Sequence, residues 1–266
     1  MPSMSRSVPW VVSTSTPHAS GGATESGGTD GAFARRHAQQ MVLPVDVVVA
    51  LPEDLDIEQA AMLCVNPMTA AGLLEGLSPG DWVVLNAGAS AIGRMIIGLA
   101  ARRGVHVVAA VRRLETADEL LQAGARKVVP DDDALPDAVR RVVGPAGVRR
   151  ALDAVAGDGA RRLFHCIADG GELLVYGLLS DDRAILPAAQ LVFRDVTVRG
   201  YSRLRNYAAL SPARRKAIGA EIVEAMRRGE LTSGVEARYP LEEVAQALGH
   251  HARPGRSGKI LLTSPA

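Results

Sequence analysis

Residues 82–93 constrain the fold of this 266-residue chain more than any other stretch. They run Trp-Val-Val-Leu-Asn-Ala-Gly-Ala-Ser-Ala-Ile-Gly, a short apolar segment that leads into a turn of small residues. A helix is expected next, because apolar side chains recur at the i, i+3, i+4, i+7 spacing of one helix face, in Ile92, Met95, Ile96 and Leu99. A strand, a tight turn and a helix that packs on a sheet are typical of α/β proteins.

The turn matches the pattern G-x-G-x-x-G, with Ser90 in place of the second glycine. Turns of this kind hold the pyrophosphate of a dinucleotide against a helix N-terminus. Serine takes more space than glycine there but adds a hydroxyl donor for phosphate. A tight turn that binds no ligand is the alternative, whereas a nucleophile elbow, G-x-S-x-G, is excluded because Ile92 occupies the position of its second glycine. The predicted cofactor-binding residues of the turn are Gly88, Ala89, Ser90, Ala91, Ile92 and Gly93.

Two arginines, Arg112 and Arg113, follow the next predicted strand, Val105–Val111. Sites for NAD have an aspartate or glutamate at this position, where it hydrogen-bonds to the ribose 2′-hydroxyl. Guanidinium groups would instead attract a 2′-phosphate and bind it with paired hydrogen bonds. The residues therefore predict NADPH as the cofactor, with a pair of solvated surface arginines as the alternative.

Apolar runs alternate with helical segments from Trp82 onward, which indicates βαβ units and a parallel sheet. The predicted strands of this sheet are Trp82–Asn86, Val105–Val111, Lys127–Pro130, Arg150–Val155, Glu172–Tyr176 and Val196–Arg199. The predicted helices, besides the one after the turn, are Asp56–Leu63, Thr116–Ala123, Leu135–Val143, Gly159–Ile167, Pro212–Arg228 and one from Leu241. Shorter extended runs are expected at Val42–Ala50, Ala237–Tyr239 and Lys259–Thr263. Six strands with crossovers predict a doubly wound α/β fold of the dinucleotide-binding (Rossmann) type.

Composition limits the classes of partner and of location. A formal net charge of +1 offers no electrostatic footprint for nucleic acid. No apolar run approaches the ~20 residues of a membrane span, and residues 1–6 lack the layout of a secretory signal, so we expect a soluble, cytoplasmic protein. Cys64 and Cys166 are too few for a disulfide framework or a cysteine-rich zinc site, and both are expected to be buried, reduced thiols. Because the histidines are scattered along the chain, no metal site is predicted.

Several stretches together carry a family pattern: Val65–Ala70, Leu85–Gly93, Val111–Arg112, Tyr176–Gly177, Leu191–Gly200 and Gly258–Ile260. With them, residues 31–264 resemble the zinc-independent medium-chain dehydrogenase/reductase superfamily. Within it, they are most similar to the 2-enoyl-thioester reductases and the NADPH:quinone reductases. The Val-Asn-Pro-x-Thr-Ala motif beside the Asn-Ala-x-x-Ser-x-x-Gly turn is the most specific part of the resemblance.

The resemblance implies further cofactor-binding residues. Asn66 and Thr69 would lie at the nicotinamide end, and the run Tyr176, Gly177, Leu178 and Leu179 would border the nicotinamide side. Tyr201 and the residues to Leu204 would close over the cofactor, and Lys259 matches a lysine on the cofactor side. The alternatives are structural: Asn66-Pro67 as a helix-initiating cap, Tyr176 as an aromatic residue at a strand end, and Lys259 as a solvated strand residue.

The resemblance also implies a domain division and a departure from the family. Residues 1–30 are expected to be a disordered segment, 31–65 a remnant of a GroES-like catalytic domain, 66–202 the NADPH-binding Rossmann domain, and 203–266 helices and a strand that return toward the catalytic domain. Most of the GroES-like domain has no counterpart, so the chain is expected to be truncated. The family's proton-donating tyrosine belongs to that domain, and no tyrosine precedes Tyr176 in the sequence, so the catalytic residue is left unknown.

Three hypotheses of function follow. The first is an NADPH-dependent oxidoreductase that transfers a hydride to the activated C=C bond of a small-molecule substrate, an enoyl thioester or a quinone. The second is a nucleotide-binding remnant with little or no turnover. The third is a dimerising or interaction protein, because the resemblance implies a homodimer formed through the edge strand Val196–Arg199.

Overall fold

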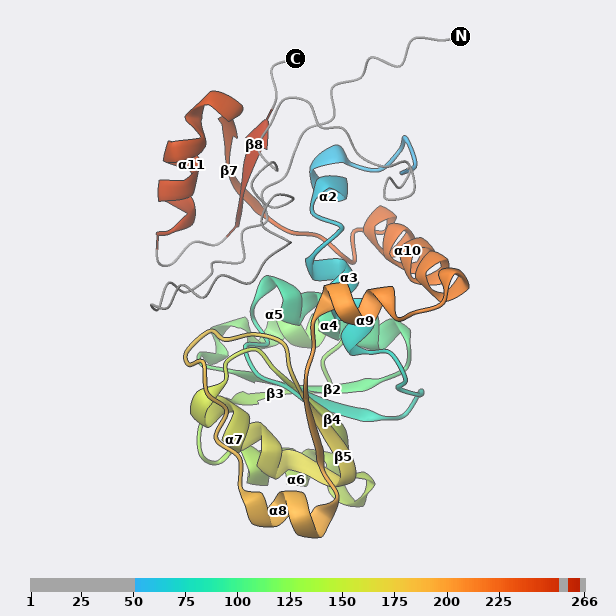
Figure 1. The fold of residues 1–266 in the computed structure, drawn as a ribbon, viewed down its shortest axis with the longest axis vertical. Helices are drawn as coiled ribbons and strands as arrows, with labels where there is room; N and C mark the ends of the chain where they lie inside the picture. The colour runs from blue at the N-terminus through green and yellow to red at the C-terminus, as the bar shows by residue number, and fades with distance from the viewer. Residues whose placement is uncertain (1–50, 254–257, 264–266) are drawn as a thin grey trace, which may run out of the picture. The chain divides into compact units, whose positions relative to one another are not determined.

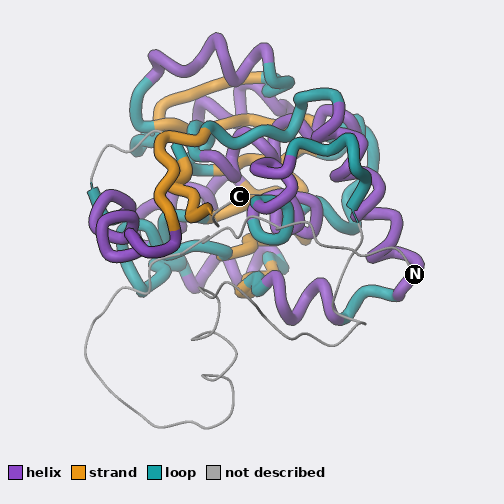
Figure 2. The backbone as a smooth tube through the Cα atoms, turned by 90° about the horizontal axis from the view of Figure 1, so that it is seen from above, coloured by secondary structure: helices purple, strands orange, loops and turns teal. Residues whose placement is uncertain are grey.

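The structure, a computed structural model, describes residues 51–253 and 258–263. The chain divides into two compact units, Val65–Leu231 and the combination of Met1–Cys64 with Thr232–Ala266. The predicted extended run Val42–Ala50 and the expected disordered segment 1–30 lie outside the described residues. Figure 2 distinguishes the helices, strands and loops of the two units.

A six-stranded, wholly parallel sheet forms the centre of the Val65–Leu231 unit. Its strands are β1 (Trp82–Leu85), β2 (His106–Val111), β3 (Lys127–Pro130), β4 (Val148–Asp153), β5 (Ile167–Val175) and β6 (Thr197–Gly200). Their order is β3-β2-β1-β4-β5-β6, so the direction of winding reverses between β1 and β4. All six predicted strands are present, and the doubly wound α/β fold is confirmed.

Helices cover both faces of this sheet (Figure 1). The helices α4 (Ala91–Arg102) and α5 (Ala117–Gln122) connect β1, β2 and β3 on one face. On the other face, α6 (Leu135–Val143) and α7 (Gly157–Cys166) connect β3, β4 and β5. A parallel sheet covered on both faces needs apolar residues throughout its strands, and five of the six residues of β2 are buried.

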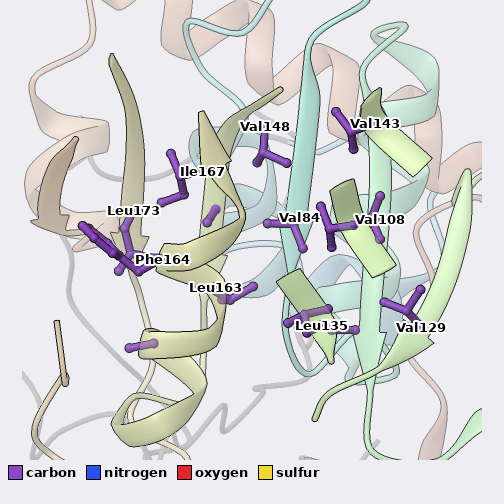
Figure 3. Close-up of a cluster of buried hydrophobic side chains, with 14 of the residues drawn as sticks. Val84, Val108, Val129, Leu135, Val143, Val148, Leu163, Phe164, Ile167 and Leu173 are labelled. Atoms are coloured by element: carbon purple, nitrogen blue, oxygen red, sulfur yellow. The ribbon is translucent and has the colours of Figure 1, made fainter. Parts of the chain in front are cut away.

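One large cluster of buried side chains lies between the sheet and the helices α6 and α7 (Figure 3). Valines from the strands, such as Val84 and Val108, meet Leu135 from α6 and Phe164 from α7. Aliphatic side chains make up nearly all of this cluster, as expected for a chain with 3% aromatic residues. Phe164 is completely buried and is the largest side chain of the described core.

The remaining helices of this unit are α3 (Asn66–Leu73), α8 (Ala188–Arg194), α9 (Arg203–Ala208) and α10 (Pro212–Arg227), with the 3-10 turns η2 (Leu114–Thr116) and η3 (Gly144–Ala146). Helix α3 packs on α4, α9 and α10. The predicted helix Pro212–Arg228 matches α10 within one residue, whereas α3, α8 and α9 were not among the predicted helices.

The smaller unit contains α2 (Ile57–Ala61), β7 (Val235–Pro240), the 3-10 turn η4 (Leu241–Glu243), α11 (Val244–His251) and β8 (Lys259–Thr263). Strands β7 and β8 pair in parallel, and their small core contains Ala247, Ile260 and Leu262. The side chain of Gln59 hydrogen-bonds twice to the main chain of Ser233, and Glu58 pairs with Arg238. Residues that precede the large unit in the sequence therefore pack with residues that follow it, and together they form the smaller unit.

The two cysteines differ from the expectation that both are buried. Cys64 is exposed, because the apolar residues that precede it, Met62 and Leu63, take the buried positions at the end of α2. The Cys166 thiol is half-buried at the end of α7, and burial raises its pKa to about 12. A thiol with so high a pKa stays protonated and unreactive at neutral pH.

The described segments contain no helix that is both long enough and apolar enough to cross a membrane. Within those same segments, no group of three or more His, Cys, Asp or Glu side chains is arranged so that it could hold a metal ion.

Candidate functional site

The carboxyl ends of the parallel strands form the edge of the sheet where most of the predicted site residues lie. The turn after β1 begins this edge: Ala87 adopts a left-handed conformation (φ 50°), and the Gly88 N–H donates to the carbonyl of Ala110 in β2 at 3.1 Å. Since Ala110 is two residues before Arg112, this hydrogen bond holds the turn close to the end of the second strand.

Two glycines of the turn occupy positions where a larger residue has no room. A Cβ atom on Gly93 would lie 2.5 Å from the Gly88 carbonyl oxygen and 2.7 Å from that of Ala87. A Cβ atom on Gly88 would lie 3.0 Å from the Ala109 Cβ. Gly93 therefore allows α4 to start directly against the turn, and Gly88 allows the turn to lie against β2. The strand, turn and helix predicted from the sequence have the close packing of a phosphate-binding turn.

Ser90 is the N-cap of α4. Its Oγ atom accepts a hydrogen bond from the Gly93 N–H at 3.1 Å. This contact uses the oxygen as an acceptor and leaves the hydroxyl proton to donate elsewhere. The N–H groups of Ala91 and Ile92 have no acceptor within the helix, as in the first turn of any α-helix, so they are directed outward at the positive end of the helix dipole.

Arg94 fixes the turn to the next helix. Its guanidinium group donates to the Ala89 carbonyl at 2.7 Å and forms two hydrogen bonds with the Glu119 carboxylate of α5, at 3.0 and 2.9 Å. The sequence did not identify this residue as important, because the pairing joins two helices that are separated by a strand.

Arg112 and Arg113 are exposed directly after β2. In the described ranges neither guanidinium group forms a salt bridge, whereas Arg94, Arg103 and Arg162 each pair with a carboxylate. Two unpaired cations at the carboxyl edge, beside a helix N-terminus, could bind a phosphate group.

Asn86 and Asp153 connect the turns after β1 and β4, and both side chains are completely buried. The Asn86 Nδ2 donates to the Asp153 Oδ1 at 2.6 Å, and the Asn86 Oδ1 accepts from the Ala154 N–H at 2.8 Å. The same Asp153 Oδ1 accepts from the N–H groups of Val155 and Ala156 at 2.9 and 3.0 Å. Neither residue was a predicted site residue, although Asn86 belongs to the turn motif and Asp153 ends an apolar strand.

The run Tyr176–Leu179 follows β5 and is bound to the turn after β4. The N–H groups of Tyr176 and Gly177 donate to the Asp153 carbonyl at 2.8 and 3.3 Å, and the Leu179 N–H donates to the Ala154 carbonyl at 3.0 Å. A Cβ atom on Gly177 would lie 2.7 Å from the Ala154 carbonyl oxygen, so this close approach needs glycine. Leu178 and Leu179 are exposed, while the Tyr176 hydroxyl is buried.

Tyr201 lies between the sheet edge and α3. Its N–H donates to the Val175 carbonyl at 2.8 Å, and its hydroxyl group lies where a Cβ atom on Gly72 would be, at 1.9 Å. On α3, Asn66 occupies the first position, and Thr69 donates its hydroxyl proton to the Val65 carbonyl at 2.7 Å. The contacts of Tyr201 thus join α3, which carries both of these residues, to the end of β5.

Lys259 is the first residue of β8 in the smaller unit. It does not belong to the set of residues that the six-stranded unit brings together. The set along the carboxyl edge consists of the turn Gly88–Gly93, the arginines 112 and 113, the run Tyr176–Leu179 and Tyr201, together with Asn86 and Asp153, which the sequence did not predict. This edge, with its switch of winding between β1 and β4, is the binding position of open α/β sheets, and it could hold a dinucleotide.

The comparisons with known proteins agree with this architecture. A family model described as "Zinc-binding dehydrogenase" matches residues 91–222. The mitochondrial enoyl-[acyl-carrier-protein] reductases of Homo sapiens and Bos taurus are each 29% identical to this chain over 232 residues. These residues are 84% of this chain and 62% of each relative, so the chain spans less than two thirds of the length of these relatives.

Solved structures with the same fold include a Bacillus thuringiensis protein assigned as an NADPH:quinone reductase, at 25% identity and a TM-score of 0.75 over 84% of this chain and 69% of that one. The complex of Etr1p with NADP and crotonyl-CoA has a TM-score of 0.69 at 21% identity, over 79% of this chain and 62% of that one. The Etr1p/Etr2p heterodimer of the mitochondrial 2-enoyl thioester reductase from Candida tropicalis has a TM-score of 0.69 at 22% identity, over 80% of this chain and 63% of that one.

The fold, the turn after β1 and these similarities agree with one another. The chain therefore resembles the medium-chain dehydrogenase/reductase superfamily, and within it the enoyl reductases and the quinone reductases.

Proposed function

We propose that this chain binds NADPH along the carboxyl edge of its six-stranded sheet and serves an oxidoreductase that reduces an activated C=C bond. The observation that carries the proposal is the Gly88–Ala110 hydrogen bond, which holds a tight phosphate-binding turn beside two unpaired arginines. A turn alone would suit NADH as well as NADPH, whereas the arginines favour the cofactor with the additional phosphate.

The residues of this edge fit the parts of the cofactor in order. The N–H groups at the start of α4, with the Ser90 hydroxyl, would bind the pyrophosphate. Arg112 and Arg113 would bind the 2′-phosphate, and Tyr176–Leu179 would border the nicotinamide. Asn66, Thr69 and Tyr201 are proposed to complete the site from α3 and from the end of β6.

When bound, NADPH would supply a hydride from C4 of its nicotinamide ring. An enoyl thioester would accept the hydride at its β-carbon and a proton from the medium at its α-carbon to give the saturated thioester, whereas a quinone would accept the hydride and a proton to give the hydroquinone. NADP⁺ is the other product in both cases. The chain's own residues would orient the ring through the fixed main chain of Tyr176–Leu179. The acceptor would be an enoyl thioester or a quinone, as the names of the relatives suggest.

A second candidate is a nucleotide-binding chain with little or no turnover. The favouring observation is that the residues identified along the carboxyl edge are all assigned to the cofactor, and none of them is assigned to a substrate.

We also propose a homodimer formed through the edge strand β6. This strand lies at the end of the sheet order, and β5 is its one neighbour among the described strands. Its unpaired edge could join the same edge of a second copy across a two-fold axis, which would extend the sheet over both copies. Among the similar structures, the Etr1p/Etr2p protein is a heterodimer.

One assay separates turnover from binding alone. The chain is mixed with NADPH and either crotonyl-CoA or a benzoquinone, and NADPH absorbance at 340 nm is followed. Consumption that depends on the acceptor supports the oxidoreductase. Binding of NADPH without consumption favours the second candidate, and the absence of binding contradicts both.

A further inference from the structure

Asp153 is a buried carboxylate that no cation neutralises. Its side chain is completely buried, and throughout the described ranges no arginine, lysine or histidine forms an ion pair with it. The Oδ1 atom accepts hydrogen bonds from Asn86 Nδ2, Val155 N–H and Ala156 N–H, while the Oδ2 atom has no partner among the described residues. In all three of these hydrogen bonds the carboxylate is the acceptor.

An unpaired buried charge is costly to a fold. The other buried ionic side chain of the sheet, Arg150, is paired with Glu172 on the neighbouring strand. Asp153 has only neutral donors around it. Uncompensated charges of this kind are concentrated at functional sites, where a ligand or a reaction makes use of them.

The position of Asp153 in the topology indicates which part of the site would sense it. Asp153 is the last residue of β4, directly after the reversal of winding between β1 and β4. A dinucleotide lies across such a reversal with one mononucleotide over each half of the sheet. If Arg112, after β2, binds the adenosine half, the nicotinamide half lies over β4 and β5.

Tyr176, which follows β5, lies close enough to Asp153 for the carboxylate to influence the pKa of its phenol. The Tyr176 hydroxyl is buried, and no residue that the structure describes forms a hydrogen bond with it. Burial, and after it the negative charge of Asp153, raise the pKa of this phenol above its ordinary value. The electrostatic influence of Asp153 therefore extends to the segment that would border the nicotinamide.

We propose that Asp153 sets the preference of the site for the oxidised, cationic nicotinamide over the reduced, neutral ring. Removal of a hydride, which is one proton with two electrons, leaves the ring with one positive charge. A fixed negative charge at this edge lowers the energy of the oxidised form relative to the reduced form, and so favours donation of the hydride. This inference rests on the proposed binding of NADPH.

Asp153→Asn tests the charge by itself. All of the hydrogen bonds to the Asp153 side chain fall on Oδ1, and asparagine can keep every one of them with its own Oδ1. Dissociation constants for NADP⁺ and NADPH are measured by calorimetry on the natural chain and on the variant. The ratio of the NADP⁺ constant to the NADPH constant is expected to rise about tenfold, the effect of one charge at roughly 10 Å in a partly polar site. For a two-electron couple, a tenfold change corresponds to about 30 mV.

Two control variants separate the charge from the structure. Asp153→Glu keeps the charge and is expected to leave the ratio within about twofold of the natural value. Asn86→Ser removes the Nδ2 donor but keeps the carboxylate, so both affinities are expected to fall together. Thermal unfolding of each variant shows whether it folds, and the natural chain alone is expected to bind NADP⁺ at least as tightly as NADPH.

The possible results distinguish a failure of the inference about Asp153 from a failure of the proposed NADPH binding. An unchanged ratio in a folded Asp153→Asn variant overturns this inference and leaves the proposed function standing. If that variant fails to fold, a natural chain that binds NADPH more than tenfold more tightly than NADP⁺ overturns the inference instead. A natural chain that binds neither form overturns the proposed function and this inference with it.

Discussion

The Asn86 amide and the Asp153 carboxylate form a buried hydrogen bond of 2.6 Å between Nδ2 and Oδ1, and it joins the ends of β1 and β4. These two strands are the neighbours between which the direction of winding reverses. The chain leaves β1 for one face of the sheet and leaves β4 for the other, so this contact fixes the two turns between which a dinucleotide would lie.

Replacement of Asn86 by alanine is expected to lower the free energy of unfolding by about 2–3 kcal/mol. The substitution removes the donor to Asp153 and the acceptor of the Ala154 N–H, and it leaves both partners buried without a replacement. Asn206→Ala on α9 is the control, because the Asn206 side chain has no hydrogen bond in the described part of the chain. Denaturant unfolding followed by circular dichroism measures both, and equal stabilities for the two variants would contradict the role of Asn86.

Gly93→Ala is expected to destabilise the chain by about 1–3 kcal/mol and to abolish dinucleotide binding. The added Cβ would lie 2.5 Å from the Gly88 carbonyl oxygen, so α4 must move away from the turn. Gly98→Ala, on the same helix, is the matched control: its nearest contact would be 3.6 Å, and alanine there is expected to stabilise the helix by about 0.5–1 kcal/mol. Thermal melts and cofactor titration distinguish them, and a Gly93→Ala variant that binds NADPH normally would count against the turn.

Arg112→Ala is expected to weaken NADPH binding by about tenfold to a hundredfold and to leave NADH binding nearly unchanged. Only NADPH carries the 2′-phosphate that the guanidinium group would bind. Arg141→Ala is the control, since Arg141 is also exposed and lies in the last turn of α6, which runs toward the opposite edge of the sheet. Calorimetric titration with both nucleotides tests the assignment, which fails if Arg112→Ala weakens both to the same degree.

The stability of the chain in acid is expected to depend on Glu75. Burial acts to raise the pKa of Glu75, but hydrogen bonds and charges from Arg214 and Arg103 outweigh it and hold the pKa below its ordinary value. A carboxyl group with a lowered folded pKa stabilises the fold above its unfolded pKa, and this stabilisation is lost as the pH falls through the folded pKa. Between pH 7 and about pH 3, the natural chain is therefore expected to lose more stability than Glu75→Gln.

Glu119→Gln provides the comparison for this measurement. The Glu119 carboxylate pairs with Arg94 but is 60% exposed, and exposed pairs contribute little. Unfolding curves recorded across the pH range should differ from the natural chain for Glu75→Gln and coincide with it for Glu119→Gln. Parallel pH profiles for all three proteins would show that the Glu75 pairing adds nothing to stability.

Thr197→Lys is expected to convert the proposed dimer into a monomer. Thr197 is exposed at the start of the edge strand β6, and an exposed lysine on an edge strand opposes pairing with another strand. Light scattering at micromolar concentration should give twice the chain mass for the natural protein and the single mass for the variant. A monomeric natural chain would refute the dimer without affecting the cofactor site.

The sequence predicts well those helices and strands that have a clear apolar pattern within their own residues. The strand Lys127–Pro130, the helix Leu135–Val143 and the strand Lys259–Thr263 have the bounds that their apolar patterns indicate. Strand β5 is longer than predicted and begins at Ile167, because its first residues pair with β4 around a register shift that no periodicity announces. The helix expected from Leu241 begins instead with the 3-10 turn η4.

The unpredicted helices have no amphipathic signal. Helix α3 buries small and apolar residues nearly uniformly, so no face of it stands out in the sequence. In α8 the apolar residues Val192 and Phe193 are exposed, which reverses the usual pattern. Contacts with distant parts of the chain, and not local preference, determine where such helices form.

Some residues of the candidate site are likewise predictable from a local motif, whereas others depend on contacts with distant parts of the chain. The turn around Ser90 is predictable because neighbouring residues in the sequence determine the conformation of a glycine-rich connection between a strand and a helix. The importance of Asp153 is not visible from its neighbours, because its partner Asn86 is 67 residues away. A pattern search along the chain finds the first kind of residue, and only the folded sheet brings together the second.

Calorimetric titration of the purified chain with NADPH and with NADH measures the two affinities on which the proposed cofactor site depends. We expect micromolar binding of NADPH and binding of NADH that is at least tenfold weaker, because the turn at Gly88–Gly93 would bind both nucleotides and Arg112 would bind only NADPH. Equal affinity for the two nucleotides would contradict the role of the arginines, and the absence of binding to either would contradict the cofactor site as a whole.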